Sequence, residues 1–127
     1  MNILDENILQ DQRERLQGWR IPIHQIGHDA GRKGMKDSEI IPFLFERRQP
    51  TFFTRDQDFC DPSLCHQRYC LVFLAVEKDE VAIFVRRLLN HPELDTKTKR
   101  MGAVIRVTHA GLSLWRLNAE REIHFGW

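Results

Sequence analysis

The segment from Cys70 to Val76 is an uninterrupted apolar run, and it limits the fold of the chain more than any other stretch. A strand without polar positions must be covered on both faces, which is typical of a central strand in a parallel sheet. Successive parallel strands are joined by crossover connections that usually contain a helix. The run therefore predicts an α/β fold, with a central parallel sheet and helices on both of its faces.

Short strand and helix patterns alternate along the rest of the chain in the order that such a fold requires. We expect strands at residues 3–4, 21–26, 51–54 and 70–76. We expect helices over 7–17 with Gly18 as a left-handed stop, from a cap at Asp37 or Ser38 to Phe45, and from a cap at Asp79 to a stop before Pro92. Residues 1–127 then form a single domain, in which 91–127 is a C-terminal extension that contains a β-hairpin around His109–Gly111.

The composition fits one globular domain, because 42% of the 127 residues are hydrophobic and 29% are charged. The formal charge of +1 gives no general bias toward nucleic acid or membrane, so a polyanion must be met by a local basic patch. No apolar run is long enough to cross a bilayer, and the first ten residues lack the pattern of a signal peptide. We expect a cytoplasmic protein with no membrane partner.

The three cysteines, Cys60, Cys65 and Cys70, are an odd number, which argues against a secreted disulfide framework. With His66 they offer the ligand types of a zinc site, but their five-residue spacing misses the two to four residues usual between such ligands. Buried free cysteine also serves as a small hydrophobe, and Cys70 opens the apolar run.

Acidic residues follow the expected strands, and this placement is the main functional signal. Asp5 and Glu6 end the first strand, Asp56 and Asp58 follow the third, and Asp37 stands at a helix entry between them. Open parallel sheets bind ligands outside the carboxyl ends of their strands. Carboxylates gathered there repel one another unless a cation such as Mg²⁺ or Mn²⁺ lies between them. The alternatives are a helix cap for Asp5 or Asp37 and a solvated turn for Asp56 and Asp58.

The motifs I-L-D-E-N, G-M-K-D-S-E-I-I and F-F-T-R-D-Q-D-F stand in this order along the first part of the chain. Their order resembles that of the PIN-like domain family, which includes the VapC-related toxin ribonucleases, and T-R-D-x-D-F is the most specific of the three. The C-terminal hairpin is similar to the short ending of such proteins.

The resemblance implies a PIN-like fold and a divalent-metal-dependent endoribonuclease that uses Mg²⁺ or Mn²⁺ on an RNA substrate. It implies the toxin component of a toxin–antitoxin pair, with a small DNA-binding antitoxin as partner. The acidic quartet would be Asp5, Asp37, Asp56 and Asp58, with Glu6 and Glu39 as further metal ligands.

Pro42 lies within the second helical pattern, so we expect either a late helix start or a local kink. A late start would let Glu39 replace Asp37 as a ligand.

Basic residues flank the expected acidic edge, where they could contact RNA phosphates: Arg32, Lys33, Lys36 and Arg55. Arg55 could instead pair with the acids. Trp19, Trp115 and Trp127 could stack on bases, although packing is the simpler interpretation. The exposed hairpin favours a homodimer through an open strand edge.

Two other functions fit the same residues. The first is a catalytically inactive PIN-like module that binds RNA or protein through the basic loops. The second is a phosphatase-like enzyme that uses the acids on a small phosphate ester. The separation of the carboxylates discriminates between a metal centre and a binding module, because ligands of one cation must converge within roughly 2–3 Å of a common point.

Overall fold

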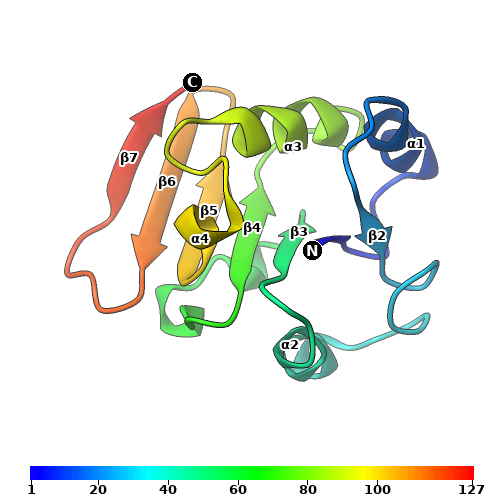
Figure 1. Cartoon of the computed structure of the whole chain (residues 1–127), viewed down its shortest axis with the longest axis horizontal. Helices are drawn as coiled ribbons and strands as arrows, with labels where there is room; N and C mark the ends of the chain where they lie inside the picture. The colour runs from blue at the N-terminus through cyan, green and yellow to red at the C-terminus, as the bar shows by residue number, and fades with distance from the viewer.

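A seven-stranded sheet runs through the computed structural model, which describes all residues from 1 to 127 (Figure 1). In chain order the strands are β1 (Asn2–Leu4), β2 (His24–Gln25), β3 (Thr51–Thr54), β4 (Cys70–Leu74), β5 (Ala103–Val107), β6 (Gly111–Arg116) and β7 (Ile123–Gly126). Across the sheet their order is β2-β1-β3-β4-β5-β6-β7. The first five of these are parallel, and β6 and β7 are added antiparallel. The expected α/β class with a central parallel sheet is confirmed.

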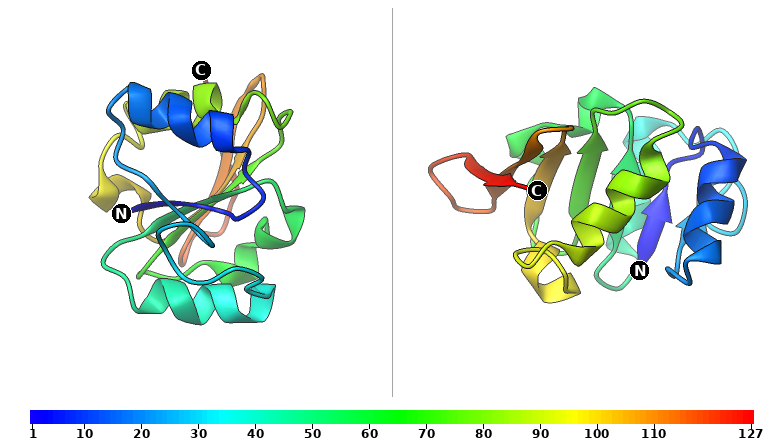
Figure 2. Two further views of the ribbon diagram at one scale, coloured as in Figure 1. Left: turned by 90° about the vertical axis from the view of Figure 1, so that its right-hand side faces the viewer. Right: turned by 90° about the horizontal axis from the view of Figure 1, so that it is seen from above.

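Helices cover both faces of the sheet, as the Cys70–Val76 run predicts (Figure 2). The helices α1 (Gln10–Gly18) and α3 (Val81–Asn90) pack on one face, in a core cluster that includes Leu16 and Leu88. The helix α2 (Asp37–Phe45) and the 3₁₀ turn η1 (Gln57–Phe59) pack on the other, in a cluster that includes Leu44 and Phe59. Two further short elements, η2 (Pro62–Leu64) and α4 (Lys97–Arg100), complete the fold.

The start of α3 is capped by a residue from another helix. The sequence predicts a cap at Asp79, but this prediction is wrong, because the N-cap residue is Glu80 and its side chain makes no capping hydrogen bond. Instead the buried side chain of Gln12, on α1, accepts the Ala82 N–H at 2.9 Å. A polar residue in a helix otherwise expected to face solvent thus joins α1 to α3.

The helices before the acidic residues also differ from the sequence-based boundaries. The helix α1 begins at Gln10 rather than residue 7, because residues 5–8 form a turn in which Ile8 N–H bonds to Asp5 O. The left-handed residue after α1 is Arg20, with φ 61°, whereas Gly18 is still helical. Of the two effects expected from Pro42, a late start or a local kink, the late start does not occur, because α2 begins at Asp37 and continues through Pro42.

The strand predictions are correct in place, and the strand at 51–54 is also correct in length, whereas two others are shorter than expected. The second strand is reduced to His24–Gln25, and the apolar run leaves the sheet after Leu74. The expected hairpin is present as β5 and β6, and β7 extends it by a strand that the sequence pattern does not reveal. No helix of the structure is both long and apolar enough to cross a bilayer.

We expect the substitution Gln12→Leu to lower the free energy of unfolding by about 1–2 kcal/mol, because the Ala82 N–H at the start of α3 loses its acceptor. Urea denaturation measures the change. The matched control is Gln17→Leu, an exposed position on the same helix, which should change stability by less than about 0.5 kcal/mol. Equal effects of the two substitutions would contradict the capping role.

Candidate metal centre

The strand order changes direction at β1, which pairs with β2 on one side and with β3 on the other. At such a switch point the loops that follow the two strands diverge to opposite faces of the sheet and leave a crevice between them. Leu4 lies opposite Phe53, and the Asp5 N–H extends the pairing to Phe53 O at 2.9 Å. The residues that follow β1 and β3 therefore meet at one edge.

A cleft of about 360 Å³ opens at this edge. Asp5 and Glu6 line it from the end of β1, Asp37 from the start of α2, and Asp56 from the turn after β3. Arg55 also lines the cleft. Four of the six acidic residues predicted from the sequence thus line one cavity, although they come from three separate segments, whereas Asp58 and Glu39 lie outside its lining.

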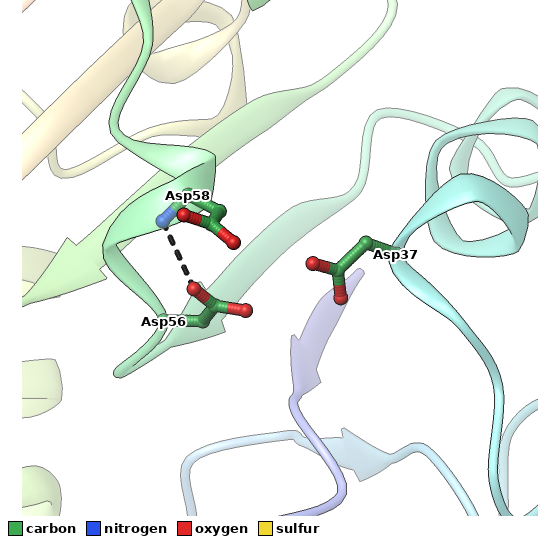
Figure 3. Close-up of side chains that lie close together, drawn as sticks. All are labelled: Asp37, Asp56 and Asp58. Carbon is green, nitrogen blue, oxygen red and sulfur yellow. Dashed lines mark hydrogen bonds between the residues drawn. The ribbon is translucent and has the colours of Figure 1, made fainter.

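Three aspartates converge most closely: Asp37, Asp56 and Asp58 each offer a carboxylate oxygen within 4.8 Å of the others (Figure 3). Asp37 points across from α2 toward the two aspartates of the β3–η1 turn. Ligands on opposite sides of a Mg²⁺ ion lie about 4.2 Å apart, because each Mg–O bond is about 2.1 Å. Only one pair among three ligands can lie opposite, and adjacent ligands of an octahedral ion are about 3.0 Å apart, so a shared ion would draw these oxygens together by about 1–2 Å. An all-carboxylate donor set suits a hard cation.

Hydrogen bonds fix the turn that carries two of these aspartates. Asp56 Oδ1 accepts the Asp58 N–H at 2.9 Å, which caps η1 and leaves the other Asp56 oxygen without a hydrogen bond in the protein. The turn considered as the alternative role for Asp56 and Asp58 is thus present, with Asp56 as its cap. It does not compete with ligand binding, because each role uses a different oxygen.

Asp5 stands apart from this trio, although it shares their cleft. Its Oδ2 accepts the Thr54 hydroxyl at 2.6 Å and its Oδ1 accepts the Glu6 N–H at 2.8 Å. Burial raises the pKa of the Asp5 carboxyl, the negative charges of Asp56 and Glu6 add to the rise, and the two hydrogen bonds oppose it. Asp5 therefore lies beside the Asp37, Asp56 and Asp58 cluster as a carboxyl of raised pKa.

The pKa of Asp37 is also raised, first by loss of surrounding water and then by the negative charges of Asp56, Asp58 and Asp5. This is the electrostatic signature of carboxylates brought together without a compensating cation.

The two glutamates predicted as further metal ligands make hydrogen bonds and an ion pair with the loop before α2. Glu6 accepts the Gly34 N–H at 2.9 Å, and its carboxylate lies so close to Gly27 that a Cβ there would stand 2.6 Å from Oε2. Glu39 accepts the Lys36 N–H at 3.2 Å and pairs with Arg32. Both glutamates therefore fasten the β2–α2 loop.

Two of the four basic residues predicted to contact RNA already have partners within the protein. Arg55 makes no ion pair within 4 Å, and its Nε donates to Val76 O at 3.0 Å. Arg32 is held by Glu39, whereas Lys33 and Lys36 are exposed and have no ion-pair partner. The structure thus places all four predicted RNA-contacting residues near the acidic edge but leaves only the two lysines uncommitted.

Two residues that sequence reasoning missed hold the centre in place. The Thr54 hydroxyl donates to Asp5 and accepts the Asp56 N–H at 3.0 Å, so it joins the two strand ends. The buried amide of Gln25 donates to Ile8 O at 2.7 Å, to Asp5 O at 3.1 Å and to Glu6 O at 3.3 Å. The only sequence signal of either Thr54 or Gln25 is its position as a polar residue at the end of a strand.

The cysteines do not form the zinc site considered from the sequence. All three are free thiols, and the aspartate trio is the one group of three or more acidic, histidine or cysteine ligands that converges. Complete burial raises the pKa of the Cys70 thiol to about 12, as expected for a residue that packs as a small hydrophobe.

Comparison with protein-family models, with characterised proteins and with solved structures finds no match to this chain.

We expect Thr54→Val to lower the affinity for Mn²⁺ by about 10–100-fold, because the hydroxyl positions both Asp5 and the backbone of Asp56. Isothermal titration calorimetry measures the affinity. The matched control is Thr51→Val, at the other end of β3, where the buried hydroxyl accepts from Arg100 instead. An unchanged Mn²⁺ affinity in Thr54→Val would contradict the positioning role.

The raised pKa of Asp37 gives a second expectation, for the protein in EDTA. A carboxyl whose pKa is higher in the folded state stabilises the fold below its unfolded pKa, near 3.8, and this contribution is lost as the pH rises through the folded pKa. Asp37→Asn should therefore melt at a higher temperature than the native protein at pH 7, and the difference should shrink below about pH 4.

The control for this expectation is Asp61→Asn, which should show the opposite sign. Hydrogen bonds from Ser63 lower the pKa of Asp61, so its contribution is present above its unfolded pKa and lost at low pH. Thermal melts of both variants between pH 3 and pH 7 make the comparison. A destabilised Asp37→Asn at pH 7 would show that the trio does not repel.

Proposed function

We propose that this protein is a divalent-metal-dependent endoribonuclease that acts on RNA with Mg²⁺ or Mn²⁺. The observation that carries the proposal is the convergence of Asp37, Asp56 and Asp58, within 4.8 Å, from two segments that are far apart in the sequence. The cleft beside them gives a substrate access to the centre. The resemblance of the T-R-D-x-D-F motif to PIN-like ribonucleases supports the same chemistry, and we propose a PIN-like fold on this basis.

In this proposal Asp37, Asp56 and Asp58 hold the ion. A bound Mg²⁺ or Mn²⁺ lowers the pKa of water and polarises phosphoryl oxygens. Asp5 faces the same cleft with a raised pKa, so it can accept a proton from the attacking water. Thr54 keeps Asp5 oriented, and the exposed Lys33 and Lys36 bind the RNA backbone near the cleft.

The proposal is tested by incubating single-stranded and structured RNA with the protein while Mg²⁺ or Mn²⁺ is titrated. Asp56→Asn should reduce cleavage by more than about 100-fold, because loss of a ligand exceeds the 10–100-fold cost typical of its supporting residues. Product mapping separates cleavage of internal phosphodiesters from a phosphatase-like removal of terminal phosphate.

Asp61→Asn is a matched control for this experiment. Asp61 caps the next 3₁₀ turn by accepting the Ser63 N–H at 2.9 Å, just as Asp56 accepts the Asp58 N–H, but it does not line the cleft. Cleavage that survives both Asp56→Asn and Asp37→Asn would exclude the proposed centre.

The second candidate function is a PIN-like module that binds RNA or protein and does not cut. The separate position of Asp5, hydrogen-bonded to Thr54 outside the trio, favours it. Under this alternative the native protein binds labelled RNA but yields no products at any concentration of Mg²⁺ or Mn²⁺.

The motif resemblance extends the proposal to a toxin of a toxin–antitoxin pair, whose partner would be a small DNA-binding antitoxin. We also propose a homodimer, which the open edge of β7 supports because that strand pairs only with β6.

A further inference from the structure

A depression of about 430 Å³ lies at the opposite end of the strands from the acidic cleft. Five residues line it, and all are basic or amides: Arg47, Arg48, Gln49, Gln67 and Arg68. They belong to the segments that lead into β3 and β4, whereas the acids follow β1 and β3. We call this surface the arginine depression.

The three guanidinium groups of the arginine depression have few polar contacts within the protein. None of them makes a side-chain hydrogen bond within the protein. Arg48 and Arg68 have no carboxylate within 4 Å, and Arg47 has only Glu46, at 3.8 Å and mostly exposed. By contrast, Arg55 and Arg100 donate to buried or half-buried acceptors. The depression therefore offers charged donors that make no hydrogen bond within the protein and can bind an external anion.

Aromatic rings beneath two of these arginines limit where their donors can point. The Arg47 guanidinium lies 3.9 Å from the ring centre of Phe43, and that of Arg68 lies 5.7 Å from the ring centre of Phe45. A planar guanidinium that stacks on a ring keeps its N–H edge free, in the fork geometry that matches phosphate oxygens. The arginines are thus arranged for anion recognition at a low cost in side-chain entropy.

The position of the depression relative to the acidic centre follows from α2. Asp37 is the first residue of this helix, and Arg47 and Arg48 come just after its end. Nine helical residues span about 13 Å, so the two sites lie at least that far apart. Opposite charges are thus separated along the strands, with acids at the carboxyl ends and arginines at the amino ends. The net charge of +1 does not reveal this separation of charge.

We infer that the arginine depression binds the phosphodiester backbone of an RNA strand, as a second contact remote from the acidic cleft. The absence of any apolar lining residue favours a phosphate backbone over an acidic peptide, because peptide interfaces depend on buried apolar anchors. The choice of RNA rests on the proposed function, whereas the site itself does not. Phosphates held here would keep the negative strand away from the metal-free aspartates until an ion neutralises them.

The test uses fluorescence anisotropy of a labelled single-stranded RNA in EDTA, where metal-dependent cleavage cannot occur. The triple variant Arg47→Gln, Arg48→Gln, Arg68→Gln should weaken binding by at least about tenfold at low salt. It should also lower the slope of log K against log salt by about 2, since each phosphate contact on a single strand contributes about 0.7. Asp56→Asn should bind RNA at least as tightly as the native protein, because it removes a negative charge, so failed cleavage and failed binding are distinguishable.

The control removes the same charge elsewhere, with Arg20→Gln, Lys78→Gln and Arg121→Gln at exposed positions outside the depression. Its salt slope should stay close to that of the native protein. If the Arg47 and Arg68 changes disturb packing, as circular dichroism would show, Arg48→Glu alone serves, because Arg48 makes no ion pair or side-chain hydrogen bond. It should weaken RNA binding without changing the melting temperature.

Three outcomes would overturn the inference. The first is an equal loss of RNA affinity in the two triple variants, which would show that only net charge matters. The second is displacement of RNA by polyglutamate as readily as by unlabelled RNA, which would indicate an acidic peptide as the ligand. The third is binding of inorganic phosphate at these arginines without any effect of the variants on RNA.

Discussion

Parallel pairing between β1 and β3 determines where every acidic side chain of the cleft can lie. The register that sets Leu4 opposite Phe53 brings Asp5 beside Thr54 and starts the Asp56–Asp58 turn at the same height. A slip of one residue would turn each side chain to the other face of the sheet. The chemistry proposed for the edge therefore depends on the burial of Leu4 and Phe53 in one core cluster and of Ile3 and Phe52 in the other, because these residues hold the register.

The charges of the molecule are divided between the two ends of the strands. At the carboxyl ends, burial and the neighbouring negative charges raise the pKa of Asp5 and Asp37, and a cation would oppose this rise. Three arginines whose guanidinium groups make no hydrogen bond within the protein gather at the amino ends. The helix α2 follows the same division of charge. The acidic residues in its first turn interact favourably with the positive end of the helix dipole, and the arginines after its last turn interact favourably with the negative end.

The sequence predicts features that depend on local pattern and misses those that depend on contact between distant segments. The apolar run at Cys70 reveals a strand covered on both faces, and acids after strands reveal the edge where they gather. The hydrogen bonds by which Gln12, Gln25 and Thr54 join separate segments reach partners 70, 17 to 20, and 49 residues away, respectively, so no local pattern identifies these contacts. Short β7 was missed because its four residues are half-exposed and gain their order from β6.

Thr54 limits which side chains its position can accept. It is fully buried, so the methyl group must fill space in the core, while its single hydroxyl hydrogen is given to Asp5 and its oxygen receives the Asp56 N–H. Serine would keep both hydrogen bonds but leave a void, and valine would fill the space but leave a donor and an acceptor unsatisfied. Threonine alone meets both demands, so random mutagenesis at this one codon should recover almost nothing else among variants of native stability.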